Sequence, residues 1–406
     1  AARGREAMKI LLHCDEYDPR HVPIAIRMSV FSQLFRQKGH EVQVLTGAQS
    51  LGDGLQPAPE ATYCPLIPLE TKSTVMRMLN QLSFGVTSFL KSFGMGAFDV
   101  VLTSSPPVLA GIFGWLIAKW KRAVFVYDVR DIWPDVALEI GAFSKGSAYC
   151  RFFECITAFL YRHADVITTV SPRKLVALRE KLPPQLRHKV WLVENGLDER
   201  FLQQKENAQV VADYHLEERF TIVYTGNMGL AQGLEHLISL AETLNPDRFQ
   251  ILLFGDGVAR RCLEDCCAQK QLRHVRFCGR VDEGTIYTVL RHAAVSYIPL
   301  VNANLKNSIP TKTYEALGAG CPVFLVAEGD AADVVRECGF GMTLSPDRIE
   351  RLPAAFSEFL EQYQTICAKR DDARKRILEN HSRQKISAAF EKRLAAYMQE
   401  TGRKRW

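Results

Sequence analysis

The chain has 406 residues and a formal net charge of +6, with 47% hydrophobic and 24% charged residues. This length exceeds what one hydrophobic core usually supports, so two domains are expected, and the composition excludes a disordered or fibrous chain. The charge is too mild to indicate nucleic acid as a partner, but it suits an anionic substrate or an anionic lipid surface.

The cysteines favour a reducing compartment. There are eleven, scattered without the spacing of a disulfide-rich secreted domain. The nearest approach to a cluster lacks paired C-x-x-C spacing and consists of Cys262, Cys266, Cys267 and Cys278. We interpret them as reduced thiols of a cytosolic protein rather than as zinc ligands.

No targeting segment is expected. The residues before Met8 read as an extension, since MKILLHC resembles a natural start, and no signal peptide is evident. The longest apolar run, Val108 to Ala118, falls far short of the ~20 residues that span a bilayer. A transmembrane anchor is therefore not predicted, while peripheral attachment stays open.

The chain begins with a predicted βαβ unit. Lys9 to Cys14 is typical of a buried parallel strand, a helix follows from about Ile24 to Lys38, and Glu41 to Thr46 gives a second strand. The turn after the first strand lacks the G-x-G-x-x-G fingerprint, which argues against a dehydrogenase. Arg27 either faces a ligand or is an exposed helix arginine.

Residues 71–98 form a basic amphipathic stretch. Lys72, Arg77 and Lys91 supply positive charge with no acidic residue among them. The apolar, aromatic face consists of Met78, Leu82, Phe89, Leu90 and Phe93. Such a stretch can lie in a membrane interface, and the alternative is an ordinary pair of core-facing helices.

Polar residues follow the strands predicted at Asp99 to Thr103 and Ala123 to Tyr127. The second strand is followed by Asp128, Arg130 and Asp131. Ligands of open parallel sheets bind beyond the carboxyl ends of the strands, so these three residues are candidates for a site. The alternative is an Asp–Arg pair that only orders a loop.

The next segments complete one domain. A helix from Tyr149 to His163, a strand from Val166 to Val170, the helix SPRKLVALREKL and a strand from Val190 to Val193 precede a turn at Asn195-Gly196. The polar stretch Gln203 to Asp213 suits a linker or a surface helix.

A second sheet follows, with glycines after its strands. The strand Phe220 to Tyr224 leads into TGNMGLAQG, whose glycines allow backbone N–H groups to approach a phosphate. The strands Ile251 to Phe254, Val275 to Cys278 and Ala294 to Pro299 end near the same predicted rim. The candidate residues at these strand ends are Gly226, Asn227, Gly229, Gln232, Gly255, Gly279, Arg280 and Val281.

The stretch NLKNSIPTKTYEALGAGCPVFLVAEGD, from Asn304 to Asp330, predicts an anion site. Pro310 opens a helix with Thr311 in its first turn, and the helix N-terminus and Lys312 attract negative charge. Glu315 lies one turn further on, where its carboxylate can accept two ribose hydroxyls. This arrangement indicates a nucleotide-diphosphate site, and the alternative is a Pro-started surface helix with a Lys–Glu pair.

Five segments resemble one enzyme family. IPTKTYEALGAGCPV is similar to the nucleotide-sugar motif of family 4 retaining glycosyltransferases, which have the GT-B fold. TSSPPVLAG, VRDIWPD, LVENGLD and YTGNMGLAQGLEHL resemble the branch that builds bacterial O-antigen and capsule repeat units, which includes N-acetyl-fucosamine transferases. The five occur in the family's order and cover most of the chain.

The resemblance implies two doubly wound α/β domains facing across a cleft. Residues 8–197 would bind the acceptor, residues 198–372 the nucleotide-sugar, and residues 373–406 would cross back to the first domain. The expected reaction moves a sugar from a donor, most plausibly UDP-linked, to a polyprenyl-diphosphate-linked saccharide, with retention and without a metal or other cofactor. The enzyme would work at the inner face of the cytoplasmic membrane, and the sugar and the oligomeric state stay open.

Residue roles follow from the same resemblance. Asp131 matches a family position near the reacting carbon, Arg130 would hold an acceptor phosphate, and Asn307 replaces the first of two family glutamates. Asp131, Lys312 and Glu315 are the predicted catalytic residues. The predicted substrate contacts are Arg27, Asp128, Arg130, Gly226, Asn227, Gly229, Gln232, Gly255, Gly279, Arg280, Val281, Asn307, Ile309, Pro310 and Thr311.

The last helix, near Lys385 to Met398, is predicted to present one apolar face, formed by Ile386, Phe390, Leu394 and Tyr397, and the final GRKRW to be a solvated tail. Two rival functions stay open. One is a UDP-sugar 2-epimerase of the same fold, and the other is a non-catalytic nucleotide-sugar-binding subunit.

Overall fold

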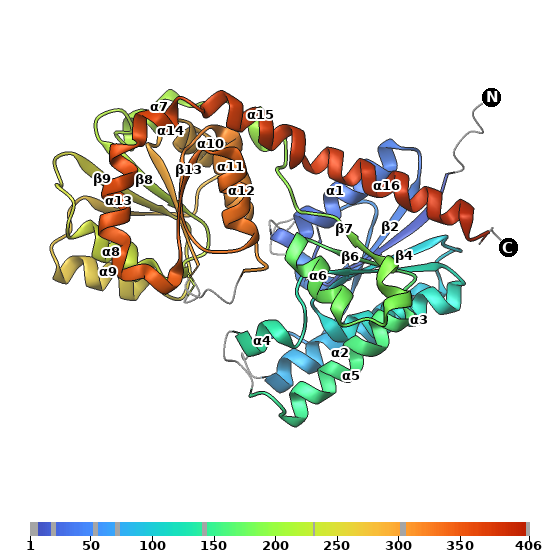
Figure 1. Ribbon diagram of the computed structural model, residues 1–406. Coiled ribbons are helices and arrows are strands. Elements are labelled where there is room, and N and C mark those ends of the chain that lie inside the picture. The colour runs from blue at the N-terminus through green and yellow to red at the C-terminus, as the bar shows by residue number, and fades with distance from the viewer. Residues whose placement is uncertain are drawn as a thin grey trace, which may run out of the picture. The chain divides into compact units, whose positions relative to one another are not determined.

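The computed structural model describes residues 7–17, 22–51, 56–69, 74–139, 144–229, 232–300 and 306–402. Residues 1–6 of the predicted extension, Lys72, and the last four residues of the tail lie outside this description. Contacts between residues divide the chain into two units (Figure 1). Unit 1 runs to Glu194 and includes the stretch from Gln384 onward, and unit 2 spans Asn195–Arg383.

Unit 1 is built on a parallel sheet of seven strands in the order β3-β2-β1-β4-β5-β6-β7. The order reverses between β1 and β4, as in a doubly wound fold. The strands are β1 Lys9–His13, β2 Glu41–Gly47, β3 Ala61–Cys64, β4 Val100–Ser105, β5 Val124–Val129, β6 Val166–Thr169 and β7 Val190–Leu192. The helices are α1 Pro23–Gln37, α2 Thr74–Phe93, α3 Val108–Lys121, α4 Asp135–Glu139, α5 Ala148–His163 and α6 Pro172–Glu180, with 3-10 turns at Ala48–Ser50 and Pro184–Lys189.

Alternate residues of the unit 1 strands feed two separate cores, because successive side chains point to opposite faces of a sheet. Leu11, Val101 and Phe125 pack against α2, α3 and α5. Ile10, Leu102 and Val124 pack against α1 and the terminal helix α16, Arg383–Glu400, which lie on the other face.

Unit 2 repeats this plan with six parallel strands in the order β10-β9-β8-β11-β12-β13 around one large core. The strands are β8 Phe220–Thr225, β9 Phe249–Phe254, β10 Val275–Gly279, β11 Val295–Pro299, β12 Val323–Val326 and β13 Gly341–Leu344. The helices are α7 Ala208–Asp213, α8 Leu234–Ala241, α9 Arg260–Gln269, α10 Glu283–His292, α11 Thr311–Ala319, α12 Asp330–Cys338, α13 Leu352–Glu361, α14 Tyr363–Cys367 and α15 Arg370–Asn380, with 3-10 turns at Phe201–Gln203 and Pro346–Arg351.

The predicted pair of doubly wound α/β domains is confirmed. The sequence analysis did not predict β3 and β13, the short strands at one edge of each sheet. It also drew a boundary at residue 372, inside α15, whereas α15 packs on α11 and α12 and belongs to unit 2.

Local signals explain where several helices begin. Pro172 opens α6 and the Ser171 hydroxyl accepts from the Lys174 N–H, while the Asp282 carboxylate caps α10 through the Thr285 N–H.

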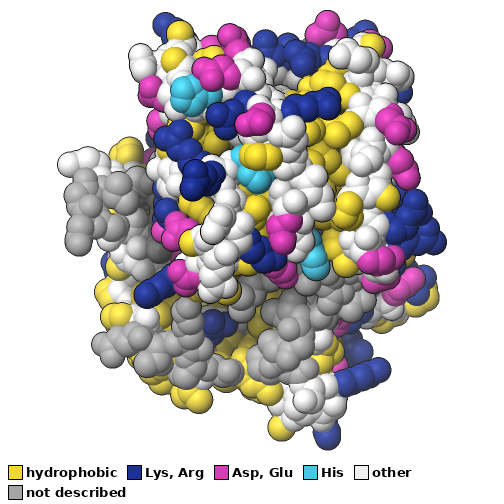
Figure 2. Space-filling model, turned by 90° about the vertical axis from the view of Figure 1, so that its left-hand side faces the viewer, with side chains coloured by type: hydrophobic (Ala, Val, Ile, Leu, Met, Phe, Trp, Pro, Cys, Tyr) yellow, Lys and Arg dark blue, Asp and Glu magenta, His cyan; other side chains and the backbone are white. Residues whose placement is uncertain are grey.

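On the face shown in Figure 2, the coloured Lys and Arg side chains are mixed with Asp and Glu, and hydrophobic side chains lie between them.

Helix α16 carries the predicted apolar face. Phe390 and Leu394 are buried, and Ile386 and Tyr397 pack partly buried on the same core beside α1 (Figure 1). The Phe390 ring lies 5.5 Å from Phe31, 6.1 Å from Phe35 and 6.4 Å from Trp191, measured between ring centroids. A segment at the end of the chain is therefore part of the core of unit 1.

Phe390→Ala is expected to lower the free energy of unfolding by about 3–5 kcal/mol, because it leaves a cavity between α16 and α1. Lys392→Ala, two residues further along on the exposed side of α16, is the matched control and is expected to change stability by less than about 0.5 kcal/mol. Urea unfolding followed by tryptophan fluorescence checks both. Equal stability of the two variants would show that α16 is not part of this core.

Candidate functional site

The N-terminus of α11 is built as an anion site. The helix begins at Thr311, one residue later than predicted. Pro310 occupies the N-cap position before it, with φ −61° and ψ 136°. No side chain caps the helix among the described residues, and the Thr313 N–H donates to Pro310 O at 2.9 Å, which leaves the N–H groups of Thr311 and Lys312 available. Gly320, with φ +81°, ends the helix.

Lys312 lies over an aromatic ring beside this helix end. Its Nζ is 4.1 Å from the centroid of the Tyr224 ring and 3.4 Å from Oε1 of Gln232. Burial lowers the pKa of Lys312 to about 7, although the charge of Glu315 acts in the opposite direction. No carboxylate of the described residues forms an ion pair with this ammonium group, so its charge is poorly compensated.

Gly226 makes room for Lys312. Its φ is +128°, and a Cβ at this position would lie 3.0 Å from Lys312 Nζ. A Cβ on Gly255, with φ +124°, would lie 1.9 Å from the Gly226 carbonyl oxygen. Gly226 therefore requires glycine for its backbone conformation, and Gly255 requires it for both conformation and space.

The ends of β8, β9 and β10 are joined by backbone hydrogen bonds. The Gly226 N–H donates to Phe254 O at 2.9 Å, and the Gly255 N–H donates to Gly279 O at 2.7 Å. The Tyr224 hydroxyl donates to Asn227 O at 2.6 Å and fixes the loop that also carries Gln232. The predicted convergence of these strand ends is confirmed for the three glycines and Gln232.

Glu315 lies one turn into α11 in a mixed electrostatic environment. Burial raises the pKa of its carboxyl, Arg383 and Lys312 lower it, and Glu283 and Asp198 raise it. Arg383 also donates to the carbonyls of Asn195 and Gly196. Tyr224 and Arg383 were not predicted as site residues. Tyr224 opens the motif YTGNMGLAQGLEHL but was assigned only to the strand, and Arg383 lies outside all five motifs.

The remaining predicted donor contacts lie after β10, in the loop after β8, and before or at the start of α11. Arg280 is exposed directly after β10, and Val281 is partly buried beside it. Asn307, Ile309, Pro310 and Thr311 are partly buried before and at the start of α11, and Gly229 lies beside the Asn227 side chain.

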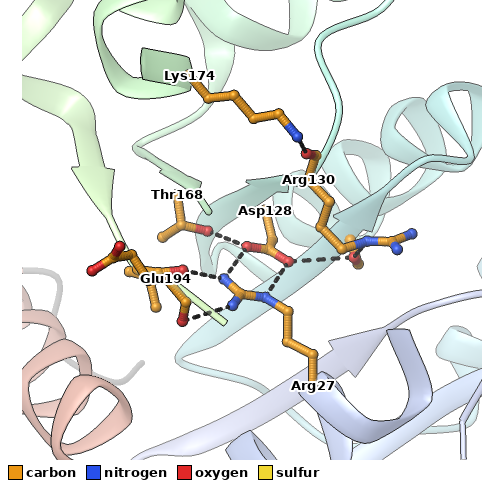
Figure 3. A network of polar contacts seen from close by, with 8 residues as sticks. Arg27, Asp128, Arg130, Thr168, Lys174 and Glu194 are labelled. Carbon is orange, nitrogen blue, oxygen red and sulfur yellow. Dashed lines mark hydrogen bonds and ion pairs between the residues drawn. The ribbon is translucent and has the colours of Figure 1, made fainter. Parts of the chain in front are cut away.

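In unit 1, Arg27 and Asp128 form a buried ion pair (Figure 3). Arg27 donates to both carboxylate oxygens, at 2.9 and 3.1 Å, and also to the carbonyls of Val193 and Glu194. Thr168 donates to Asp128 at 2.6 Å. Burial alone would raise the pKa of Asp128, but Arg27, Thr168 and Arg130 together hold it below its ordinary value.

This network corrects two predictions. Asp128 does not follow the strand, because β5 continues to Val129, and its side chain is 0% exposed. Arg27 is 4% exposed, so it is not an exposed helix arginine, and its guanidinium is occupied by Asp128 and two carbonyls. The pair fastens α1 to β5 and to the end of β7.

Arg130 and Asp131 lie at the carboxyl end of β5. Arg130 donates to Ser104 Oγ at 3.0 Å and to Pro106 O at 2.6 Å. Asp131 keeps 38% of its side chain exposed and forms an ion pair with the buried Lys174 at 3.0 Å. Lys174 also donates to the Arg130 carbonyl (Figure 3). Sequence reasoning missed Lys174, although the Ser171-Pro172 helix start places it in the first turn of α6.

Helix α2 exposes a row of apolar side chains at helical spacing, here called the α2 stripe: Val75, Leu79, Leu82, Val86, Leu90 and Phe93. Leu90 is 57% exposed, and Phe93 contacts the exposed Trp120 of α3 at 5.1 Å between ring centroids. The predicted apolar face is partly wrong, because Met78 and Phe89 pack on the core. No described helix is both long and apolar enough to span a membrane.

The described residues contain no group of three or more His, Cys, Asp or Glu side chains able to hold a metal ion. All eleven cysteines are free thiols.

Comparison with known proteins agrees with this geometry. Residues 25–195 match the model described as glycosyl transferase 4-like domain, and residues 207–381 match the model described as glycosyl transferases group 1. The chain therefore carries a glycosyl transferase 4-like domain followed by a group 1 glycosyl transferase domain.

Two curated relatives are similar at 24% identity. One is the probable glycosyltransferase WbjE of Pseudomonas aeruginosa, aligned over 65% of this chain and 66% of that protein. The other is the putative colanic acid biosynthesis glycosyl transferase WcaI of Escherichia coli strain K12, over 87% and 92%. Among solved structures, Anabaena HepE in complex with UDP and glucose superposes with a TM-score of 0.73 at 14% identity, over 96% of this chain and 100% of that one. The two units thus have the GT-B fold.

Asp128→Ala is expected to lower the free energy of unfolding by about 3–5 kcal/mol, because it leaves the Arg27 guanidinium buried without its counter-charge. The double variant Arg27→Met with Asp128→Leu removes both charges and is expected to lose less. Thermal or urea unfolding at pH 7 compares the two. A single variant no less stable than the double variant would contradict the buried-pair account.

Proposed function

We propose that the protein is a retaining, metal-independent glycosyltransferase that uses a UDP-linked sugar and extends a polyprenyl-diphosphate-linked saccharide for cell-surface polysaccharide. The observation that carries the proposal is the desolvated Lys312 ammonium beside the uncapped α11 N-terminus. A diphosphate is the ligand chemistry that supplies two negative charges to both features at once.

The electrostatics of this position favour a diphosphate. Burial lowers the pKa of Lys312 to about 7, which means that the surrounding protein disfavours the charged amine. An anion bound beside Nζ would reverse this effect and raise the pKa again. Gly226 and Gly255 leave the backbone open for the same close approach.

Transfer breaks the bond between the anomeric carbon and the diphosphate oxygen, and the electron pair leaves with the nucleoside diphosphate. Lys312 and the free N–H groups of α11 would stabilise the charge that develops on this oxygen. Fixed donors of this kind do the work that a divalent cation does elsewhere, so no metal is needed. The Glu315 carboxylate would accept the ribose hydroxyls, as predicted.

Unit 1 supplies groups suited to the acceptor. Arg130 lies at the carboxyl end of β5 with a guanidinium able to bind a phosphate, and Asp131 beside it keeps an exposed carboxylate. The names of WcaI and WbjE, and the UDP and glucose bound to HepE, support the assignment to polysaccharide synthesis and to a UDP-sugar.

We also propose that the α2 stripe rests on the inner face of the cytoplasmic membrane. Six apolar side chains on one helix make an apolar surface of the kind that marks an interaction site. Trp120 and Phe93 lie together at its end, where aromatic rings suit the level of the lipid headgroups. A lipid-linked acceptor would be met there.

Lys312→Met tests the donor site. We expect at least about a 100-fold loss of kcat, because a donor to the developing charge is removed, with unchanged thermal unfolding. UDP-glucose affinity, measured by calorimetry, is expected to fall at least about tenfold.

The pH dependence gives a second readout of Lys312. Below pH 7 the wild-type amine is charged, so affinity for UDP-glucose is expected to be highest there and to decline as pH rises towards 8.5, whereas Lys312→Met is flat. Lys375→Met, on the exposed side of α15, is the matched control and should behave like wild type. Full transfer activity in Lys312→Met would overturn the proposal, and conversion of the donor without acceptor would favour an epimerase.

The pair Leu79→Ser with Leu90→Ser tests membrane docking. Both side chains are exposed, so the fold should persist, while sedimentation with phosphatidylglycerol liposomes is expected to drop roughly tenfold through lost apolar burial. Val176→Ser, an exposed apolar residue of α6, is the control. Unchanged sedimentation of the double variant would rule out the α2 stripe as the contact.

A further inference from the structure

Unit 1 contains a cavity of about 730 Å³ at the carboxyl ends of β1 and β2, beside α2. Its volume falls within the ~300–1,000 Å³ of small-molecule sites. The polar side chains that line it are Asp15, Glu16, Gln49, Arg77, Asn80 and Gln81. A second hollow of about 360 Å³ shares Asp15, Glu16 and Gln81 and continues to Arg130.

Two polar atoms on the shared wall lack partners. Oδ1 of Asp15 and Oε1 of Gln81 are buried and accept no hydrogen bond from the residues that the structure describes. Buried polar atoms are nearly always hydrogen-bonded, so each of these needs an explanation. Both are acceptors, and a ligand that satisfies this wall must therefore bring donors such as hydroxyl groups.

The wall is fixed in place by the backbone. The Gly47 N–H donates to Asp15 O at 3.1 Å, and a Cβ at Gly47 would lie 2.7 Å from that oxygen. Asn80 Nδ2 donates to Ile67 O at 2.7 Å and holds α2 against the segment of residues 66–69, which also lines the cavity. Asp15 and Gln81 therefore present their side chains from preorganised positions.

We propose that this cavity binds a saccharide unit of the acceptor, whose hydroxyl groups donate hydrogen bonds to Asp15 and Gln81. The assignment rests on the transfer function proposed above and adds to it a binding site for the acceptor sugar. Carboxylates, amides and one arginine form a lining that matches a neutral, hydroxyl-rich ligand. Leu66, Pro68 and Leu69 add apolar contacts for the CH faces of a sugar ring.

The position of the cavity on α2 agrees with a lipid-linked sugar. Arg77 and Gln81 line the cavity, while Leu79 and Leu82 of the same helix belong to the α2 stripe. A saccharide in the cavity would therefore lie next to the surface that carries its lipid. Arg77 and Arg130 flank the two hollows with positive charge, which suits a neighbouring diphosphate.

Titration of Asp15 provides an independent readout. Burial raises the pKa of Asp15 to about 7, Arg130 lowers it, and Glu16 raises it. The other titratable or charged groups that face it from the described residues are the Cys14 thiol and, across the cavity, Arg77. The acceptor strength of this carboxylate should therefore increase between pH 6 and 8.

The test uses octyl β-glucoside, octyl β-galactoside and octyl N-acetyl-β-glucosaminide below their micelle concentrations, with the full-length protein. Saturation-transfer NMR and calorimetry measure binding. We expect at least one glycoside to bind wild type, Asp15→Asn and Gln81→Met each to weaken it at least about tenfold, and Asp265→Asn, an exposed control in unit 2, to leave it unchanged. Binding to wild type should strengthen from pH 6 to 8, and binding to Asp15→Asn should not.

UDP-glucose affinity, measured on the same samples, separates this proposal from the transfer function and reports on folding. If UDP-glucose binds normally but no glycoside binds, or if glycosides bind all variants equally through their octyl chains, the saccharide site is overturned and the transfer function stands. If UDP-glucose itself does not bind wild type, the proposed function fails.

Discussion

The candidate site of unit 2 depends on the ammonium group of Lys312, which lies in surroundings that disfavour its positive charge. The Lys312 ammonium lies over the Tyr224 ring, against a glycine that leaves just enough room, and no described carboxylate is paired with it. Lys312 is partly buried without a carboxylate partner among the described residues, and this desolvation lowers its pKa to about 7. The glycines at the ends of β8 and β9 and the uncapped α11 N-terminus all leave the same corner open to an anion.

In unit 1, by contrast, the buried charges are paired with each other. The Arg27–Asp128 pair is fully compensated by two hydrogen bonds between the partners and by Thr168, Val193 and Glu194. Such a pair fixes geometry and has no capacity left for a ligand. The groups with remaining capacity are Asp131, Arg130 and the side chains of the cavity beside Asp15. A buried charge whose hydrogen bonds are all made within the protein is therefore assigned a structural role, and a charge that keeps exposed atoms is a candidate for ligand binding.

The fold was predictable from sequence where periodicity is strong. Buried strands such as β1, β5 and β9 read as short apolar runs, and the motif around Pro310 located α11 to within one residue. The edge strands β3 and β13 carry partly exposed residues and give a weaker signal. The face of α2 was only partly predicted, because period alone does not say which of two apolar rows meets the core.

The site was predictable where the chemistry lies in one local motif, as for Lys312 and Glu315. It was not predictable where partners come from distant segments. Asp128 looked like a loop carboxylate until Arg27, 101 positions earlier, proved to bury it. The fold brings distant segments together, and only then do Tyr224, Lys174 and the Asp15–Gln81 wall become recognisable as parts of a site.

The most direct measurement of the central claim is a crystal structure of the protein with bound UDP. The account predicts that the diphosphate lies within hydrogen-bond distance of Lys312 Nζ and of the first N–H groups of α11, with the ribose hydroxyls on Glu315. A diphosphate bound elsewhere, with Lys312 still resting on Tyr224 and Gln232, would contradict it.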